Sequence, residues 1–499
     1  MLKRILCALL AGMMLIPLTA CSESEVNKGN ETTATVSGTP DAAVEGEEET
    51  KKFLDDMPEK MDFEGREIRF AVEEGANGNL TELSIYIEED TGDVVDSAVY
   101  NRNLTVSDRL NIQIVLSECL VGGNTVAPLV RTSVTGGSDD YDLIGLYQYY
   151  GARFASEGYL YNLNNLQYND FDREYWGSMY IDAMSYKGRT YWATGDMALR
   201  YTGGMYVTYV NDRLWNDYFP GVSVYDMVDE GTWTIDKMYD ISSQVYVDAN
   251  ADGQSTKDDV FGLALEINDL IDGMCAGLMV EFGNLDEEGN PYISLNNERT
   301  YVAYDKLYQL THNNPGFINT ATDDSIYLMT KYNEGKYMMV VNKLYQSAIY
   351  LREMEDDFKI IPIPKLDETQ ERYNTRIHDS VTLFGMPITA VGQADAISAS
   401  LEALASESYK VVSPAYYETA LKVKFTRDSD SGRMIDLISQ NVSTDFVTLY
   451  SNALSDINHF FRNNLSSGVE SIASKFKSSQ KVWDKITQKF LQAFEDIEE

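Results

Sequence analysis

The chain has 499 residues, of which 79 are acidic and 40 are basic, so its formal net charge is −39. A charge of this sign argues against nucleic acid or an anionic membrane surface as a direct partner, because both would be repelled. Hydrophobic residues make up 44% of the chain and charged residues 24%, as in a globular protein, and the length suggests two domains.

The N-terminus has the layout of a secretory signal, with Lys3 and Arg4 before an apolar run and small residues before Cys21. The run is short for a membrane-spanning helix, which needs about 20 apolar residues. Its ending, LTAC, resembles the bacterial lipobox and predicts a signal peptide over residues 1–20 with a lipid on Cys21. The alternative is a soluble secreted protein in which Cys21 is incidental.

Residues 21–55 follow as a segment rich in Ser, Thr, Gly and Glu. Such a composition cannot bury enough apolar surface to offset the entropy lost on ordering. The sequence therefore predicts a flexible acidic tether that ends near residue 55, with the folded part beginning at residue 56.

Strands and helices alternate in the first part of the folded region. The hydrophobic pattern predicts strands at 66–74, over NIQIVLS and at 141–146, with helices at 96–110 and over NTVAPLVRTSVTGG. Alternation of this kind indicates an α/β fold, in which ligands bind at the carboxyl ends of strands. Residues 147–150 follow the third strand, and we expect them to face a cleft. The chain also holds 34 tyrosines against 18 phenylalanines, and tyrosine suits stacking on a polar small molecule.

The second part continues the pattern. We expect a hairpin over 187–199 around Gly188, a strand running into a helix over 205–219, and a helix within 231–247 that begins after a Thr cap. VFGLAL is a predicted strand, 298–314 an amphipathic helix, 332–342 a turn before an apolar strand, and 358–366 an extended segment because of its prolines. The last 110 or so residues read as largely helical.

The loop DANADGQSTKDD (248–259) has the acceptor spacing of a calcium-binding loop, with Gly253 at the sixth position. A helix is expected before it and a strand after it, and its twelfth residue is Asp rather than the Glu of an EF-hand. Calcium binding and a plain acidic turn both remain open, and no cofactor is otherwise required. The calcium ligands would be the side chains of Asp248, Asn250, Asp252 and Asp259 and the carbonyl of Gln254.

The sequence carries no sign of catalysis. His312, His378 and His459 have no metal-type spacing, and no nucleophile elbow, phosphate loop or dinucleotide fingerprint is present. His312 and His459 read as structural or surface residues, whereas His378 precedes a strand beside Asp379. A glycosidase-type pair of carboxylates stays open, because distance in space cannot be read from the sequence. Whether Cys119 pairs with Cys275 is equally open.

Seven segments in order resemble the lipid-anchored extracellular solute-binding proteins of bacterial ABC importers, within the carbohydrate-receptor family that includes maltose-binding protein. The resemblance covers nearly the whole mature chain. The C-terminal part of the chain is similar to that of a clostridial branch of the family. The matching segments are SAVYNRNLTVSDRLNIQIV, YDLIGLYQYYGARFASEGYLYNLNNL, MYVTYVNDRLW, GTWTIDKM, NEGKYMMVVN, IIPIPK and ALASESYKVVSPAYYETALKVKFTRDSDSGRMIDLI. This chain is longer than the simplest members of the family, so the positions of their pocket residues transfer less directly to this sequence.

The resemblance implies a two-lobe periplasmic-binding-protein-like fold with a hinge and an interlobe ligand cleft. Lobe 1 would comprise residues 56–209 and 380–412, and lobe 2 residues 210–379 and 413–499. Crossings are expected near 206–211, near 361–379 and from about 413. By position, the expected ligand-binding residues are Tyr147, Gln148, Tyr149, Trp192, Asp196, Tyr201, Glu266, Asn342, Tyr345, His378 and Asp379.

The implied function is that of a monomeric receptor, held on the extracellular face of the cell membrane by its lipid alone. It would bind an oligosaccharide and deliver it to the transmembrane subunits of an ABC permease. The alternatives are a cell-surface enzyme that degrades glycans and a glycan-binding surface protein that does not take part in transport.

Overall fold

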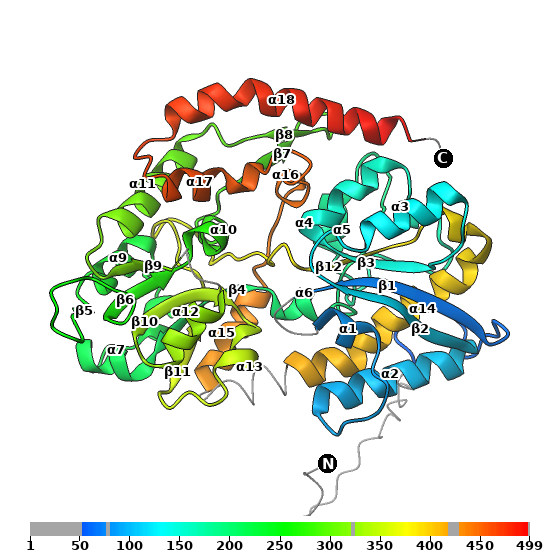
Figure 1. Cartoon of the computed structure of the whole chain (residues 1–499), viewed down its shortest axis with the longest axis horizontal. Helices are drawn as coiled ribbons and strands as arrows, with labels where there is room; N and C mark the ends of the chain where they lie inside the picture. Colours follow the sequence, from blue (N-terminus) through cyan, green and yellow to red (C-terminus); the bar gives the residue numbers. More distant parts are fainter. Residues whose placement is uncertain (1–51, 76–79, 321–324, 418–428, 498–499) are drawn as a thin grey trace, which may run out of the picture. The chain divides into compact units, whose positions relative to one another are not determined.

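The computed structural model describes residues 52–75, 80–320, 325–417 and 429–497 (Figure 1). The predicted signal peptide, Cys21 and nearly all of the predicted tether lie outside these residues. Lys51–Glu499 form one compact unit. In the described ranges, no helix is long and apolar enough to cross a membrane.

Lobe 1 is built on a four-stranded sheet of order β12-β3-β1-β2. β1 (Arg66–Glu74) pairs in parallel with β2 (Ile112–Val121) and β3 (Leu143–Tyr147), while β12 (Thr382–Gly385) returns antiparallel to β3. The predicted strands are confirmed. Helices of lobe 1 are α1 (Leu80–Ile85), α2 (Val94–Leu110), α3 (Ala127–Gly136), α4 (Gln148–Gly151), α5 (Ser178–Met184), α6 (Leu199–Gly203) and α14 (Ala394–Glu407).

Lobe 2 is built on a six-stranded sheet of order β11-β4-β10-β6-β5, with β9 paired to β6. Its strands are β4 (Tyr206–Asn211), β5 (Tyr246–Val247), β6 (Val260–Leu265), β9 (Phe317–Asn319), β10 (Tyr337–Lys343) and β11 (Phe358–Ile361). Its helices are α7 (Asp212–Tyr218), α8 (Val224–Asp229), α9 (Ile235–Ser242), α10 (Ile267–Gly277), α11 (Glu298–His312), α12 (Ser325–Asn333), α13 (Gln346–Tyr350) and α15 (Ser429–Ser439). The predicted Thr cap is confirmed, because the Thr234 side chain accepts from the Lys237 N–H at the start of α9.

A small hairpin and three C-terminal helices complete the described chain. β7 (Gly283–Leu285) pairs antiparallel with β8 (Pro291–Ile293). α16 (Phe446–Leu449), α17 (Phe460–Ser466) and α18 (Ala473–Glu495) follow, and α18 lies along the β7–β8 hairpin (Figure 1). Rings of α16 and α18 pack on lobe 1, with Phe494 at 6.0 Å from both Tyr186 and Tyr191.

Three sequence expectations need correction. The tether cannot extend to residue 55, because Phe53 and Asp55 are buried. The boundary expected after residue 209 falls inside β4, all of which pairs in the second sheet. The segment expected to form a hairpin at 187–199 has its turn at Gly188, which adopts φ +77°, but it forms only isolated bridges rather than strands.

The loop 248–259 is also framed differently from the expectation. α9 ends at Ser242, and the short strand β5 precedes the loop, so β5 and β6 flank it as an antiparallel pair. Asp259 accepts from the backbone N–H of Ala249 (3.0 Å) and of Thr256 (2.8 Å). Asp248 accepts from the N–H of Gly253 at 2.7 Å. In the described residues, no group of three or more His, Cys, Asp or Glu side chains is placed to hold a metal ion.

Candidate functional site

Two backbone segments that join the lobes lie side by side, and the segment that follows α15 lies next to one of them. Part of the crossing expected from about residue 413 lies outside the described residues. Met205 bridges Ile377, and the His378 N–H donates to the Gly204 carbonyl at 2.9 Å. On the other side, the Thr375 N–H donates to the carbonyl of Asn441 at 3.0 Å. Crossing strands paired in this way form a hinge, since small dihedral changes in them rotate one lobe against the other.

The end of β3 brings three predicted residues to this junction. The buried Glu73 carboxylate accepts from the Tyr147 N–H (3.1 Å) and the Thr125 N–H (2.8 Å), which sets the direction in which the chain leaves the strand. Burial raises the pKa of Glu73. The next residue, Gln148, donates through Nε2 to the carbonyl of Leu449 at 2.7 Å. The carboxyl end of β3 thus contacts the C-terminal segment that contains α16, α17 and α18. The sequence did not predict this contact.

Tyr149 lies between the hinge and the same C-terminal segment. Its N–H donates to the Asp379 carbonyl at 3.0 Å, and its hydroxyl donates to Asp456 at 2.8 Å. Its ring stacks on His459 with centroids 5.3 Å apart. Burial and the charge of Arg462 lower the pKa of His459 to about 4, so this imidazole is neutral at pH 7.

At the N-terminal end of α10, Asp269 contacts a lysine of lobe 2 and a histidine of the hinge. Asp269 accepts from Lys343 Nζ at 2.8 Å and lies 3.0 Å from His378 Nε2. Burial alone would raise the pKa of Asp269, but the charges of Lys343 and His378 outweigh it and hold this pKa well below its usual range. Asp269 is therefore a fixed carboxylate that orients both partners.

One turn further along α10, Asp272 meets two guanidinium groups. Arg376 lies at 3.0 Å and Arg462 at 3.6 Å. Burial raises the pKa of Asp272 to about 6 against the pull of both arginines. Within the described part of the chain, its Oδ1 is buried with no hydrogen-bond partner, and leaving such an atom unpaired is costly.

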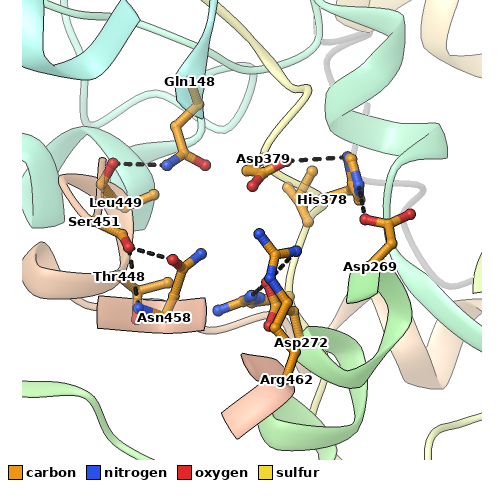
Figure 2. Close-up of polar contacts among 12 residues, drawn as sticks. Gln148, Asp269, Asp272, His378, Asp379, Thr448, Leu449, Ser451, Asn458 and Arg462 are labelled. Atoms are coloured by element: carbon orange, nitrogen blue, oxygen red, sulfur yellow. Dashed lines mark hydrogen bonds and ion pairs between the residues drawn. The ribbon is translucent and has the colours of Figure 1, made fainter. Parts of the chain in front are cut away.

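These side chains form a polar ring contributed by both lobes and by the C-terminal segment. We define the ring as Gln148, Tyr149, Asp269, Asp272, Lys343, Arg376, His378, Asp379 and Arg462. Figure 2 shows Gln148, Asp269, Asp272, His378, Asp379 and Arg462 around one region, with Ser451 and Asn458 beside it. A cavity of about 400 Å³ adjoins the ring and shares Arg376 with it.

A second predicted group gathers around Arg200 instead. The guanidinium is buried, pairs with Glu74 at 2.9 Å, and lies over the rings of Tyr147 (5.1 Å) and Tyr345 (5.7 Å). Tyr345 follows β10, so this cation also links the lobes. Contacts of this kind stabilise a buried arginine and fix the orientation of both rings.

The remaining residues that were predicted to bind the ligand lie outside the polar ring. Trp192 is fully buried in the core of lobe 1 and donates to the Ala152 carbonyl at 3.3 Å, so it is a packing residue. Asp196 accepts from Ser413, and Tyr201 packs edge-on against Tyr180. Glu266 occupies the N-cap position of α10, but its side chain forms no capping hydrogen bond there. Asn342 is fully buried and accepts from the Lys343 N–H at 2.9 Å.

Sequence reasoning missed the basic residues and the C-terminal contribution. Lys343 is the last residue of the otherwise apolar strand β10, and this isolated charge is the one signal that could have identified it. Arg376 and Arg462 reach the ring only through tertiary contacts, so no local pattern marks them. Cys119 and Cys275 are not joined to each other by a disulfide, which answers the question of their pairing.

No protein-family model and no curated protein matches the chain. Solved structures do resemble it. An ABC substrate-binding protein of Listeria monocytogenes in complex with cycloalternan has 14% identity and a TM-score of 0.55, covering 85% of this chain and 99% of its own. An ABC-transporter solute-binding protein of Thermotoga lettingae bound to α-D-tagatose has 13% identity and a TM-score of 0.55, covering 85% of this chain and 100% of its own.

Maltose-bound MalE3 of T. maritima is a third such structure, with 13% identity, a TM-score of 0.52, and coverage of 86% of this chain and 99% of its own. At these identities the likeness concerns the fold. The chain thus has the two-lobe α/β fold of ABC-transporter solute-binding proteins, as the sequence predicted.

Proposed function

We propose that the protein is an extracellular solute-binding receptor of an ABC importer, and that its solute is a carbohydrate held in the polar ring. The carrying observation is the ring itself, which combines carboxylates, an amide and a tyrosine from both lobes at a paired-strand hinge. Carboxylates and amides bind sugar hydroxyls, and aromatic faces stack on the apolar side of a pyranose. The sugars named for the similar structures support this class of ligand.

Binding would act through the hinge. A solute that contacts both lobes favours the closed arrangement by the difference between its affinities for the two states. A permease can then distinguish loaded from empty receptor by shape. Delivery to permease subunits, a lipid on Cys21, an extracellular location and a monomeric state belong to the same proposal, as does the clostridial branch.

Calorimetric titration of the mature protein with a panel of glycans tests the proposal. One class of glycan is expected to release or absorb heat and to raise the melting temperature, without release of reducing ends. Turnover in that assay would instead indicate a glycan-degrading enzyme. Absence of binding across the panel, with binding of peptides or polyamines, would overturn the carbohydrate assignment.

Asp379→Asn sharpens the same experiment at the ring. Its carboxylate is 24% exposed and lies beside His378, so the substitution removes a charged acceptor with little change in shape. Loss of a charge-assisted hydrogen bond costs roughly 1.5–3 kcal/mol, which corresponds to about a 10- to 100-fold weaker Kd. Asp395→Asn, in the first turn of α14, is the matched control and should bind normally.

The anchor has its own test. Cys21→Ser in the native host should abolish incorporation of labelled fatty acid and shift the protein from the membrane fraction to the medium. Unchanged labelling would contradict the lipobox interpretation.

A further inference from the structure

The C-terminal segment 446–495, which we call the strap, contacts both lobes through its helices α16, α17 and α18. Its α17 packs on lobe 2 along α10. The ring of Phe461 in α17 is fully buried, with its centroid 5.3 Å from that of Tyr304 in α11 and 6.1 Å from that of Phe282. This part of the strap therefore belongs to the core of lobe 2.

The other end of the strap is docked on lobe 1. The middle of α18 packs on α17, where the ring centroids of Trp483 and Phe460 lie 5.0 Å apart. The helix then runs to lobe 1, where the ring of Phe494 lies 6.0 Å from those of Tyr186 and Tyr191 (Figure 1). All five rings are buried. A single helix of 23 residues thus connects the two lobes.

Tyr186 of lobe 1 holds the docked end in place. Its hydroxyl lies 3.1 Å from the side-chain oxygen of Asn290 in the β7–β8 hairpin and 3.1 Å from Glu495 in α18. Glu495 also pairs with Lys187, next to Tyr186 in the chain. Lobe 1 cannot move away from lobe 2 and the strap without breaking these contacts.

The strap is strained where it passes the polar ring. Between α16 and α17, Ser455 and Asp456 adopt φ +63° and +53° in succession. Positive φ is costly for residues other than glycine and persists only where neighbouring contacts hold it. One such contact is the hydrogen bond from the Tyr149 hydroxyl to Asp456 at 2.8 Å, and Tyr149 belongs to the ring. The docked arrangement therefore carries strain next to the proposed solute site.

The elements that meet at Tyr186 also form a wall of the cavity beside the ring. The 400 Å³ cavity is lined by Tyr186 of lobe 1, by Pro291 of the β7–β8 hairpin and by Phe446 of α16. These three residues come from the parts of the molecule that docking brings together. Separation of the strap and the hairpin from lobe 1 would therefore open this wall.

We propose that the strap is a latch between the lobes, which docks on Tyr186 to retain the solute and undocks to let the solute exchange. This regulation rests on the proposed function, because the solute is the one proposed for the ring. Tyr186 is a positioning residue of the latch. The strained turn at Ser455 and Asp456 is its joint, which weakens docking enough to make it reversible. A solute that contacts ring residues of both lobes then favours the docked state.

The distance between spin labels on the two lobes tests the latch without any solute. Thr132→Cys in α3 of lobe 1 and Gln309→Cys in α11 of lobe 2 place the labels at exposed positions. The mature protein for this measurement carries Cys21→Ser and Cys119→Ser, and Cys275 is fully buried. Pulsed electron paramagnetic resonance gives the distribution of distances, in which the undocked state is the longer population.

Two changes of different strength should undock the strap. A chain that ends after Lys489 lacks the part of α18 that touches lobe 1, and most of its molecules should show the longer distance. Tyr186→Phe removes only the hydroxyl and should raise the undocked population about fivefold, equivalent to ~1 kcal/mol. Tyr225→Phe is the matched control, because that hydroxyl bonds to Ser431 within lobe 2 at 2.9 Å, and it should leave the distances unchanged.

Ser455→Gly should act in the opposite direction. Glycine adopts positive φ without strain, so the substitution stabilises the docked turn. In the Tyr186→Phe protein it should lower the undocked population about fivefold, back toward that of wild type. Ala251→Gly is the matched control, at an exposed position of lobe 2 with φ +58°, and should leave the distances unchanged.

The outcomes separate the latch from the proposed function. Identical distance distributions in the shortened chain, in Tyr186→Phe and in wild type would overturn the latch, whatever happens to the melting temperature, and the receptor function would stand. For a glycan that binds, Tyr186→Phe should also raise the dissociation rate about fivefold, and an unchanged rate would overturn the role of the strap in solute exchange. Failure of every glycan to bind would overturn the proposed function and the retention of a sugar with it.

Discussion

At the scale of single residues, several cations of this strongly acidic chain form buried ion pairs. Arg109 lies 2.6 Å from Asp55, with both side chains almost fully buried, and Arg200 pairs with Glu74. Removing one partner of a buried pair leaves the other charge without compensation, which costs more than the pair contributes when intact. Such residues should therefore dominate the effect of point substitutions.

Asp55→Ala is expected to lower the free energy of unfolding by about 3–5 kcal/mol. Its neighbour provides the control: Asp56 is 61% exposed and pairs with a half-exposed Arg173, so Asp56→Ala should cost about 0–1 kcal/mol. Urea unfolding followed by circular dichroism measures both. Equal effects of the two substitutions would contradict the structural role of the Asp55–Arg109 pair.

Glu402 predicts a pH dependence. Burial raises its pKa from 4.5 to about 7, although Tyr175 and Trp176 donate hydrogen bonds to it. Between these values the unfolded state releases the proton and the folded state keeps it, so stability falls as the pH rises through this window and then levels off. Below pH 4.5 both states are protonated and the effect vanishes.

Glu402→Gln lacks this titration. Its stability relative to wild type should increase between pH 4.5 and pH 8, by at most about 3 kcal/mol. Urea unfolding at several pH values measures the difference, in which other titrating groups such as His459 cancel. A difference that does not vary with pH would show that Glu402 ionises normally in the folded protein.

At the scale of elements, the turn at 248–259 carries the calcium hypothesis. Its acidic oxygens already accept backbone N–H groups, so the turn has a defined shape without an ion. A calcium concentration about 100 times the Kd should add ~2.7 kcal/mol to the free energy of unfolding.

Thermal unfolding with calcium and with chelator measures this effect. Asp259→Asn should abolish the calcium response, whereas Asp258→Asn should preserve it, because Asp258 pairs with Lys331 outside the turn. The same melting temperature with saturating calcium and with chelator would show that the turn binds no calcium and is a plain acidic turn.

At the scale of the whole molecule, the net charge of −39 opposes compaction through self-repulsion. Raising the ionic strength from 0.01 M to 0.15 M shortens the Debye length from about 30 Å to ~8 Å. The melting temperature should therefore rise with sodium chloride over this range and not with an uncharged solute at equal osmolarity. A fall with salt would mean that exposed ion pairs outweigh the repulsion.

Much of the architecture followed from local pattern. Alternating strands and helices predicted the α/β class. The end of β3 was predictable because a strand end is a local feature, and the segment after it lies beside the hinge, while its contact with a ligand stays a prediction. The helix α2 and strands β1 and β3 were predicted from periodicity alone. Trp192 was assigned wrongly to the ligand, since periodicity does not tell a core-facing aromatic residue from one that faces a cleft.

The sequence by itself determined the charge and the class of fold, because each depends on composition or on residues near one another in the chain; the signal peptide and its lipid stay predictions of the same kind. Only the tertiary structure decided the site. Asp272, Arg376 and Arg462 meet from α10, the hinge and α17, and Gln148 meets Leu449 across 301 positions of sequence. Contacts between segments so far apart depend on how the lobes and the C-terminal helices pack, and no local pattern encodes that packing.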